Sequence, residues 1–168
     1  SRYTDEDILA VIDHLREVGG SRYDAATLEA GRNFFVGEPD GSWQPADEIQ
    51  GREVLVVGPG PGLEGELVAI ESYIRTARPY VIALNTEDRV SRDLVDIRAA
   101  CHPVRMLADC EHYTGFPHRL ATPASRLPSS LSEALKGVDL LDFGLSVTPG
   151  EFEAKADRCT LPQSLVIA

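Results

Sequence analysis

Apolar residues recur at helical spacing in the first part of the chain. Between residues 4 and 18, and again between 24 and 35, they stand three or four positions apart, which predicts two short amphipathic helices. Thr4 is placed to cap the first helix, and Gly19–Gly20 end it. Two helices of this length cannot bury both apolar faces by themselves. We therefore predict a helical hairpin over residues 1–36 that docks on another surface.

Residues 37–50 are rich in proline, glycine and aspartate and are predicted to be a linker, in which Trp43 anchors the chain by packing. Beyond this linker, short apolar runs alternate with amphipathic stretches. The predicted strands cover residues 52–58, 79–85, 94–101, 118–122, 138–147 and 158–161. The predicted helices cover residues 62–78, 103–113 and 129–135, and a further helix opens at Pro162.

This alternation predicts the fold class. Strands separated by helices at such spacing form a parallel sheet with right-handed crossovers. The near-continuous apolar run at 79–85 is typical of a strand covered on both faces. We predict an α/β chain, with a Rossmann-like three-layer domain and a mostly parallel sheet over residues 51–168, preceded by the N-terminal helical hairpin. Ligands of such sheets bind beyond the carboxyl ends of the strands, near a point where the strand order reverses.

A glycine-rich loop carries the strongest functional signal. Gly58, Gly60 and Gly62 follow the first predicted strand, and a predicted helix begins directly after them. Backbone N–H groups and the positive end of a helix dipole meet at such a point, which favours phosphate or another anion. The alternative is a tight strand-to-helix turn without a ligand.

Neighbouring residues limit the classes of ligand that this loop can bind. Pro59 and Pro61 remove two amides from it. Asn85 stands where a dinucleotide fold carries a ribose-binding carboxylate, which disfavours nicotinamide redox chemistry. The loop lacks lysine, and no serine or threonine follows it, which excludes a Walker-type phosphate loop. We expect a nucleotide or nucleotide-sugar-like ligand, with its phosphates on the three glycines and its ribose or base at Asn85 and Thr86.

His102 and Ser125 are predicted to line the opposite wall of this site, because each follows a predicted strand. His102 is a candidate acid–base group, and a structural role in a turn is the alternative. The cysteine, histidine and acidic residues from Cys101 to His118 do not have the ligand spacing of a zinc site, so we expect no metal in this chain.

Charge and cysteine content limit the partners and the compartment. The chain carries 27 acidic and 16 basic residues, a net charge of −11, without a dense basic run, which disfavours nucleic acid and anionic membranes as partners. No apolar stretch in the sequence reaches the length of a membrane span. Three cysteines do not indicate a disulfide scaffold, so we expect a cytoplasmic protein. The apolar ending at residues 165–168 leads us to expect a piece of a longer protein.

Several motifs resemble one family. The segments EVLVVGPGPG at 53–62, IALNTED at 82–88 and ACHPVRMLAD at 100–109 look like the C-terminal part of bacterial aldolase-family proteins, of the hydroxymethylglutaryl-CoA lyase-like and 4-hydroxy-2-oxovalerate aldolase-like kind. The resemblance covers nearly the whole chain. It implies that the carbon–carbon lyase chemistry and its divalent metal belong to an aldolase barrel outside this sequence, and that the hairpin contacts that barrel or a partner.

The region from residue 51 onward is similar in turn to the 6-hydroxymethylpterin diphosphokinase-like and motility accessory factor group. The loop of that group usually carries serine where Gly62 stands here. The resemblance implies an accessory domain of an aldolase, a domain that binds a nucleotide or nucleotide-sugar-like ligand and is not catalytic alone. One alternative is a nucleotide-dependent glycosyl- or diphosphotransferase. The other is a non-catalytic module for docking or oligomerisation, through which the chain forms a homo-oligomer.

Overall fold

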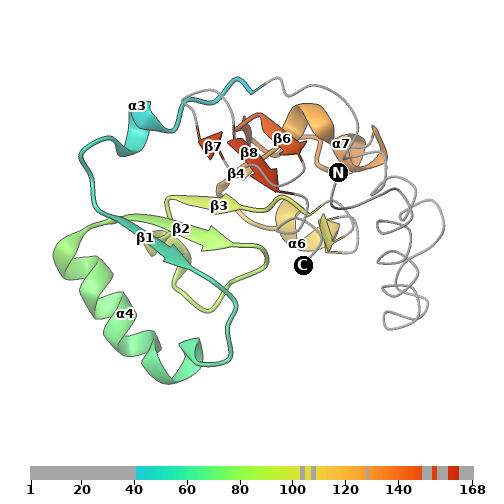
Figure 1. Cartoon of the computed structure of the whole chain (residues 1–168). Helices are drawn as coiled ribbons and strands as arrows, with labels where there is room; N and C mark the ends of the chain where they lie inside the picture. The colour runs from blue at the N-terminus through green and yellow to red at the C-terminus, as the bar shows by residue number, and fades with distance from the viewer. Residues whose placement is uncertain are drawn as a thin grey trace.

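A computed structural model describes residues 41–102, 105–106, 109–127, 129–148, 153–154 and 159–162 (Figure 1). Five strands form one sheet in which every neighbouring pair is parallel. They are β1 (Val54–Val57), β2 (Tyr80–Leu84), β3 (Ile97–Ala99), β4 (Arg119–Thr122) and β5 (Leu140–Asp142). This parallel sheet with its helices confirms the predicted Rossmann-like α/β class. The predicted helical hairpin lies outside the described residues.

The five strands follow one another across the sheet in chain order, β1-β2-β3-β4-β5. The chain therefore always advances in the same direction, and right-handed crossovers then place every connection between these strands on the same face. The prediction that ligands bind near a reversal of strand order is wrong for these five strands, because their order does not reverse. Such reversals occur in sheets that are wound in two directions, whereas this sheet is wound in a single direction.

Helix α4 (Leu63–Ala77) connects β1 to β2 and packs on the crossover face. Its apolar positions fall one or two turns apart, so Leu63 and Ile74 are buried against Val57 and Val81. The helix is followed by its C-cap, Arg78, which has a left-handed backbone (φ 53°) and whose N–H donates to the Ile74 carbonyl at 2.9 Å. The residue after Arg78 is a proline, which cannot continue a helix.

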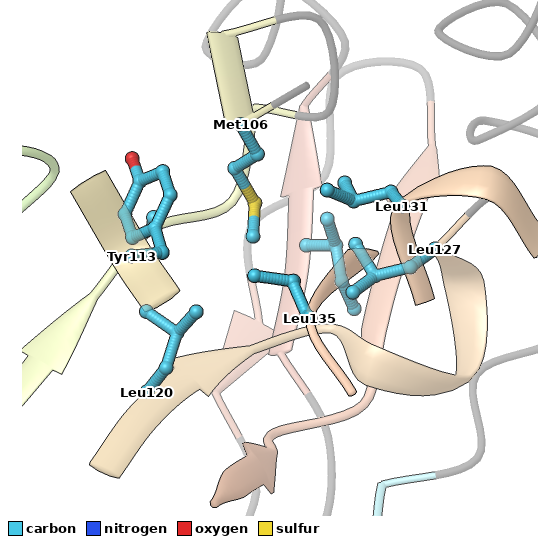
Figure 2. Packing of buried hydrophobic residues seen from close by; sticks show 8 residues of the cluster. Met106, Tyr113, Leu120, Leu127, Leu131 and Leu135 are labelled. Carbon is cyan, nitrogen blue, oxygen red and sulfur yellow. The ribbon is translucent and has the colours of Figure 1, made fainter. Parts of the chain in front are cut away.

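A second apolar cluster lies over β4 and β5 on the same face. Helix α6 (Cys110–Thr114) and helix α7 (Ser129–Ala134) contribute to it, together with Met106. Figure 2 shows its labelled side chains pointing toward one another: Met106, Tyr113, Leu120, Leu127, Leu131 and Leu135. Residues 105–106 are helical as well, so the helix predicted over residues 103–113 is found in part, and the gaps at 103–104 and 107–108 lie outside the described residues.

On the opposite face of the sheet, residues of β2 to β5 pack against the chain that leads into β1, while Val54 and Val56 of β1 are exposed. Helix α3 (Ala46–Ile49) lies within the segment predicted as a linker, and its Ile49 packs with Trp43 against Tyr80 and Ile97. The predicted packing role of Trp43 is confirmed. This segment is therefore a third layer of the domain, across the sheet from α4, α6 and α7.

Two short 3-10 turns lie next to strands of the main sheet. Three further strands form a second sheet. The turns are η2 (Arg92–Leu94), before β3, and η3 (Ala124–Arg126), after β4. The second sheet has the order β6-β8-β7, from β6 (Leu145–Thr148), β7 (Glu153–Ala154) and β8 (Cys159–Pro162). In it β8 is parallel to β6 and antiparallel to β7.

The prediction of one continuous strand over residues 138–147 is therefore wrong. Its apolar run divides into β5 and β6 at Gly144, which has a positive φ of 63° that breaks an extended strand. The strand predicted at 158–161 is found as β8. Pro162 is the last residue of β8 rather than the start of a helix.

One ion pair attaches α3 to the sheet. Arg119 of β4 donates to both carboxylate oxygens of Glu48, at 2.8 and 2.5 Å. Trp43 Nε1 and the Tyr80 hydroxyl donate to the same carboxylate at 3.0 and 2.9 Å. The hydrogen bonds from Arg119 lower the pKa of Glu48 to about 2, against the effect of burial, while burial and the bond to Glu48 raise the pKa of Tyr80 to about 12.

We predict that Glu48→Gln lowers the free energy of unfolding by about 1–3 kcal/mol near neutral pH, because Arg119 loses its charged partner. The folded pKa of Glu48 lies below its ordinary value of 4.5, so the carboxylate stabilises the protein above about pH 4.5 and ceases to do so as the pH falls toward 2. Urea unfolding at pH 7 and at pH 3 measures this. The difference between the two proteins should be smaller at pH 3.

The matched control is Glu133→Gln, which removes a carboxylate from an exposed pair with Lys136 at 3.4 Å. We expect it to change stability by less than about 0.5 kcal/mol. An equal effect of the two substitutions, or a Glu48→Gln deficit that does not depend on pH, would contradict the structural role of Glu48.

Candidate functional site

The residues predicted from strand ends all lie at the carboxyl edge of the main sheet. Gly58 directly follows β1, Asn85 and Thr86 follow β2, His102 lies three residues after β3, and Ser125 lies three residues after β4. Because all strands are parallel and in chain order, these segments form a row along one edge rather than two facing walls.

This row places the residues of the single predicted site at the ends of different strands. β1 and β2 are neighbours, with Val57 paired to Ala83, so the glycine loop lies beside Asn85 and Thr86. Ser125 follows β4, and β4 is three strands away from β1, a distance of about 14 Å at ordinary strand spacing. The glycine loop and Ser125 cannot meet the same small anion. Only an extended ligand spans from the loop to His102.

Within the glycine loop, some of the predicted anion donors are already used. Gly60 N–H donates to the Gly58 carbonyl at 2.9 Å, and Leu63 N–H donates to the Gly60 carbonyl at 3.2 Å. Gly62 is the N-cap of α4 with an ordinary helical backbone (φ −71°). The helix that follows has 15 residues, so its dipole is directed at this loop.

Neither packing nor backbone conformation requires glycine in this loop. Among the described glycines, positive φ angles occur at Gly51, Gly137 and Gly144, outside the loop. A Cβ atom added to Gly60 or Gly62 would meet no atom within 4 Å. The two glycines therefore leave the backbone open to a group that approaches it from outside.

Arg89 extends over this open loop from the turn after β2. Its Nη1 donates to the Gly60 carbonyl at 3.1 Å. Its Nε and Nη2 contact the carboxylate of Glu87, which is 2% exposed and also accepts the Arg89 N–H at 2.8 Å. Burial raises the pKa of Glu87, but the hydrogen bonds from Arg89 outweigh it and leave that pKa below its ordinary value.

Arg98 of β3 holds the backbone that carries Asn85. Its side chain is buried, stacks on the Phe116 ring at 3.6 Å from the centroid, and donates from Nη1 to the Asn85 carbonyl at 2.6 Å. Asn85 has a left-handed backbone (φ 53°), a conformation that this bond helps to fix. Burial lowers the pKa of Arg98, and its Nε has no hydrogen-bond partner in the described structure.

His102 is positioned by the turn that it begins. Its Nδ1 accepts the Arg105 N–H at 3.4 Å, and its carbonyl accepts the Met106 N–H at 2.9 Å. Burial, reinforced by the nearby charge of Arg105, lowers the pKa of His102, so the ring is neutral near pH 7. With Nδ1 as acceptor, the proton of the neutral ring is on Nε2.

At the far end of the row, Asp142 organises the carboxyl edge near Ser125. Its buried carboxylate accepts the Ser125 N–H at 2.6 Å and the Gly144 N–H at 3.0 Å, and its carbonyl accepts the Trp43 N–H at 2.7 Å. The Ser125 backbone is thereby fixed, while its side chain is exposed.

Sequence reasoning missed Glu87, Arg89, Arg98 and Asp142 as organisers of this edge. A usable signal existed for Arg98, which with Asp96 is one of two charged residues inside the otherwise apolar run 94–101. For Asp142, one of the two hydrogen bonds comes from Gly144, two residues along the chain, and the other from Ser125, which is 17 residues away and which no local pattern indicates.

The described residues contain no group of three or more histidine, cysteine or acidic side chains that converges as a metal site would. Among the described residues, Cys101 and Cys110 take part in no disulfide. In the same part of the chain, none of the helices combines the length and the apolar character needed to cross a bilayer. Comparisons of the sequence with protein-family models, with curated proteins and with solved structures gave no match.

We predict that Arg89→Gln destabilises the protein by about 3 kcal/mol at pH 7, because Glu87 remains buried without its cationic partner. The pKa of Glu87 then rises above its unfolded value, so the variant is more stable below that value and loses stability as the pH rises. Thermal unfolding at pH 5 and pH 7 should give a smaller deficit at pH 5. The double variant Glu87→Gln, Arg89→Gln should recover stability at pH 7. A deficit that is the same at both pH values would refute the assignment.

Proposed function

We propose that this domain binds an anionic, nucleotide-like ligand along the carboxyl edge of β1, β2 and β3. The observation that carries the proposal is the open backbone at Gly60 and Gly62. Both positions have room for a side chain and no conformational need for glycine. A bound group that approaches the loop backbone would require the side chain to be absent, as in other glycine-rich phosphate loops.

Local charge indicates where the anionic group binds. The N-terminus of α4 favours an anion, but Glu64 and Glu66 in its first turn oppose one on the helix axis. On the other side of the loop, Arg89 contacts the Gly60 carbonyl and is held in place by Glu87. We therefore place the anionic group between the loop and Arg89, on the β2 side.

The remainder of the ligand would extend toward β3. Asn85 and Thr86 come first, and Arg98 orders the backbone at Asn85 before any ligand binds, which reduces the entropy cost of binding. His102 lies at the next strand end, two strands from β1, about 10 Å along the edge at ordinary strand spacing. Its neutral ring can donate a hydrogen bond from Nε2. Ser125 is left out of the proposed site, one strand beyond His102.

A binding role is compatible with the resemblance to the C-terminal part of aldolase-family proteins. In that setting the domain would sense or position a nucleotide-like ligand next to a lyase barrel. The carbon–carbon bond chemistry is assigned to no residue of this chain. His102 is held through Nδ1 by its own turn, which favours a binding contact over proton transfer.

The test is a thermal-shift screen against CMP-, UDP- and GDP-sugars, NAD(P), ATP and pterins, followed by calorimetry on any hit. A ligand at 100 times its Kd adds about 2.7 kcal/mol of stability. We expect Gly60→Val to unfold within a few degrees of the wild type, because its Cβ meets open space, and to bind the hit at least tenfold more weakly.

Gly65→Ala is the matched control. Gly65 lies within α4, and a Cβ there also meets no atom within 4 Å, so we expect higher helix stability and unchanged affinity. A screen without a hit, or a Gly60→Val protein that binds as well as the wild type, would overturn the proposal.

A further inference from the structure

The structure contains a surface cavity of about 320 Å³, wide open to solvent, at the edge of the sheet opposite to the glycine loop. It is lined by Arg52, two residues before β1, by Pro79 before β2, by Val95 and Asp96 before β3, and by the last turn of α4. It therefore lies at the amino ends of β1, β2 and β3, away from every residue of the proposed carboxyl-edge site. Its volume is at the lower end of those that hold small ligands.

Three arginines from different elements line this cavity: Arg52, Arg75 and Arg78. The chain has only 16 basic residues against 27 acidic ones, so three in one small cavity is a local reversal of its charge. The two aspartates of the lining, Asp93 and Asp96, leave its charged groups with a net charge of +1, and neither carboxylate pairs with Arg52 or Arg78. Asp96 accepts the Val81 N–H at 2.7 Å, and Asp93 pairs with Arg75 at 3.4 Å.

Two of the three guanidinium groups, those of Arg52 and Arg78, are not paired with a described carboxylate. Arg75 also contacts Glu71, at 3.8 Å. Within the described residues, Arg52 and Arg78 have no carboxylate within ion-pair distance, and Arg52 lies over the Tyr80 ring, 4.9 Å from its centroid. Ile74, Leu94 and Val95 supply an apolar part of the lining.

We propose that this amino-edge cavity is a second binding site, for a small oxyanion ligand with an apolar portion, held by Arg52 and Arg78. A guanidinium group binds phosphate and carboxylate through paired N–H donors, and two such groups around one cavity can hold one anionic group. The apolar lining accommodates a few carbon atoms. The site is independent of the proposed function, because it shares no residue with the carboxyl edge.

Calorimetry of the whole chain at constant ionic strength tests this, with inorganic phosphate, pyrophosphate and malonate as probes and chloride as the background anion. We expect saturable binding of at least one probe. A stronger response to phosphate and pyrophosphate identifies a phosphorylated ligand class, and a stronger response to malonate identifies a carboxylate class.

Arg78→Gly is the decisive variant. Arg78 has φ 53°, a conformation that glycine adopts without strain, so the melting temperature should be unchanged or higher. We expect its affinity for the probe to fall at least tenfold, and Arg52→Gln should produce a loss of the same kind. Lys136→Gln, which makes the same change in net charge at an exposed residue of the opposite end of the domain, should bind as the wild type does.

Gly60→Val separates the two sites, because it should leave this binding unchanged. The proposal is overturned if no probe binds saturably, or if Arg78→Gly binds as well as the wild type. It is also overturned if Lys136→Gln weakens binding equally, or if Gly60→Val abolishes binding and Arg78→Gly does not.

Discussion

The order of the strands is the constraint on which the other features of this domain depend. Because β1 to β5 follow one another in a single direction, right-handed crossovers place α4, α6 and α7 on one face of the sheet. The other face receives no crossover helix between these strands. Part of it packs against α3 and Trp43, which are held there by the ion pair between Glu48 and Arg119, while Val54 and Val56 of β1 are exposed on this face.

The same order determines what the carboxyl edge can bind. A reversal of strand order would separate two neighbouring strand-end loops and open a crevice between them. Here the strand ends form a row, so a ligand must lie along the edge rather than between two walls. The row is organised by backbone contacts: Arg98 fixes Asn85, Arg105 fixes His102, and Asp142 fixes Ser125. Such contacts order the loops before a ligand arrives, which lowers the entropy cost of binding.

Arginine side chains make many of the contacts that hold these loops and layers in place, in a chain with only two lysines, Lys136 and Lys155. Arg119 and Arg89 each engage a carboxylate through two nitrogens, and Arg98 stacks on Phe116 while donating to a carbonyl. A planar group with five donors can do these things, and a lysine ammonium cannot. The charges of these three arginines are therefore committed within the fold. Arg52 and Arg78 differ because they line a cavity without an acidic partner among the described residues.

The sequence by itself determined the local elements and the edge at which the glycine loop lies. Apolar spacing places β1, α4, β2 and β4 near their observed bounds, because burial of one face depends on residues a few positions apart. Only the tertiary structure decided the strand order, the division of 138–147 at Gly144, and the contacts that orient the site. The Glu48–Arg119 pair joins residues 71 positions apart. Such contacts follow from how whole elements pack, and no periodicity within a single segment encodes them.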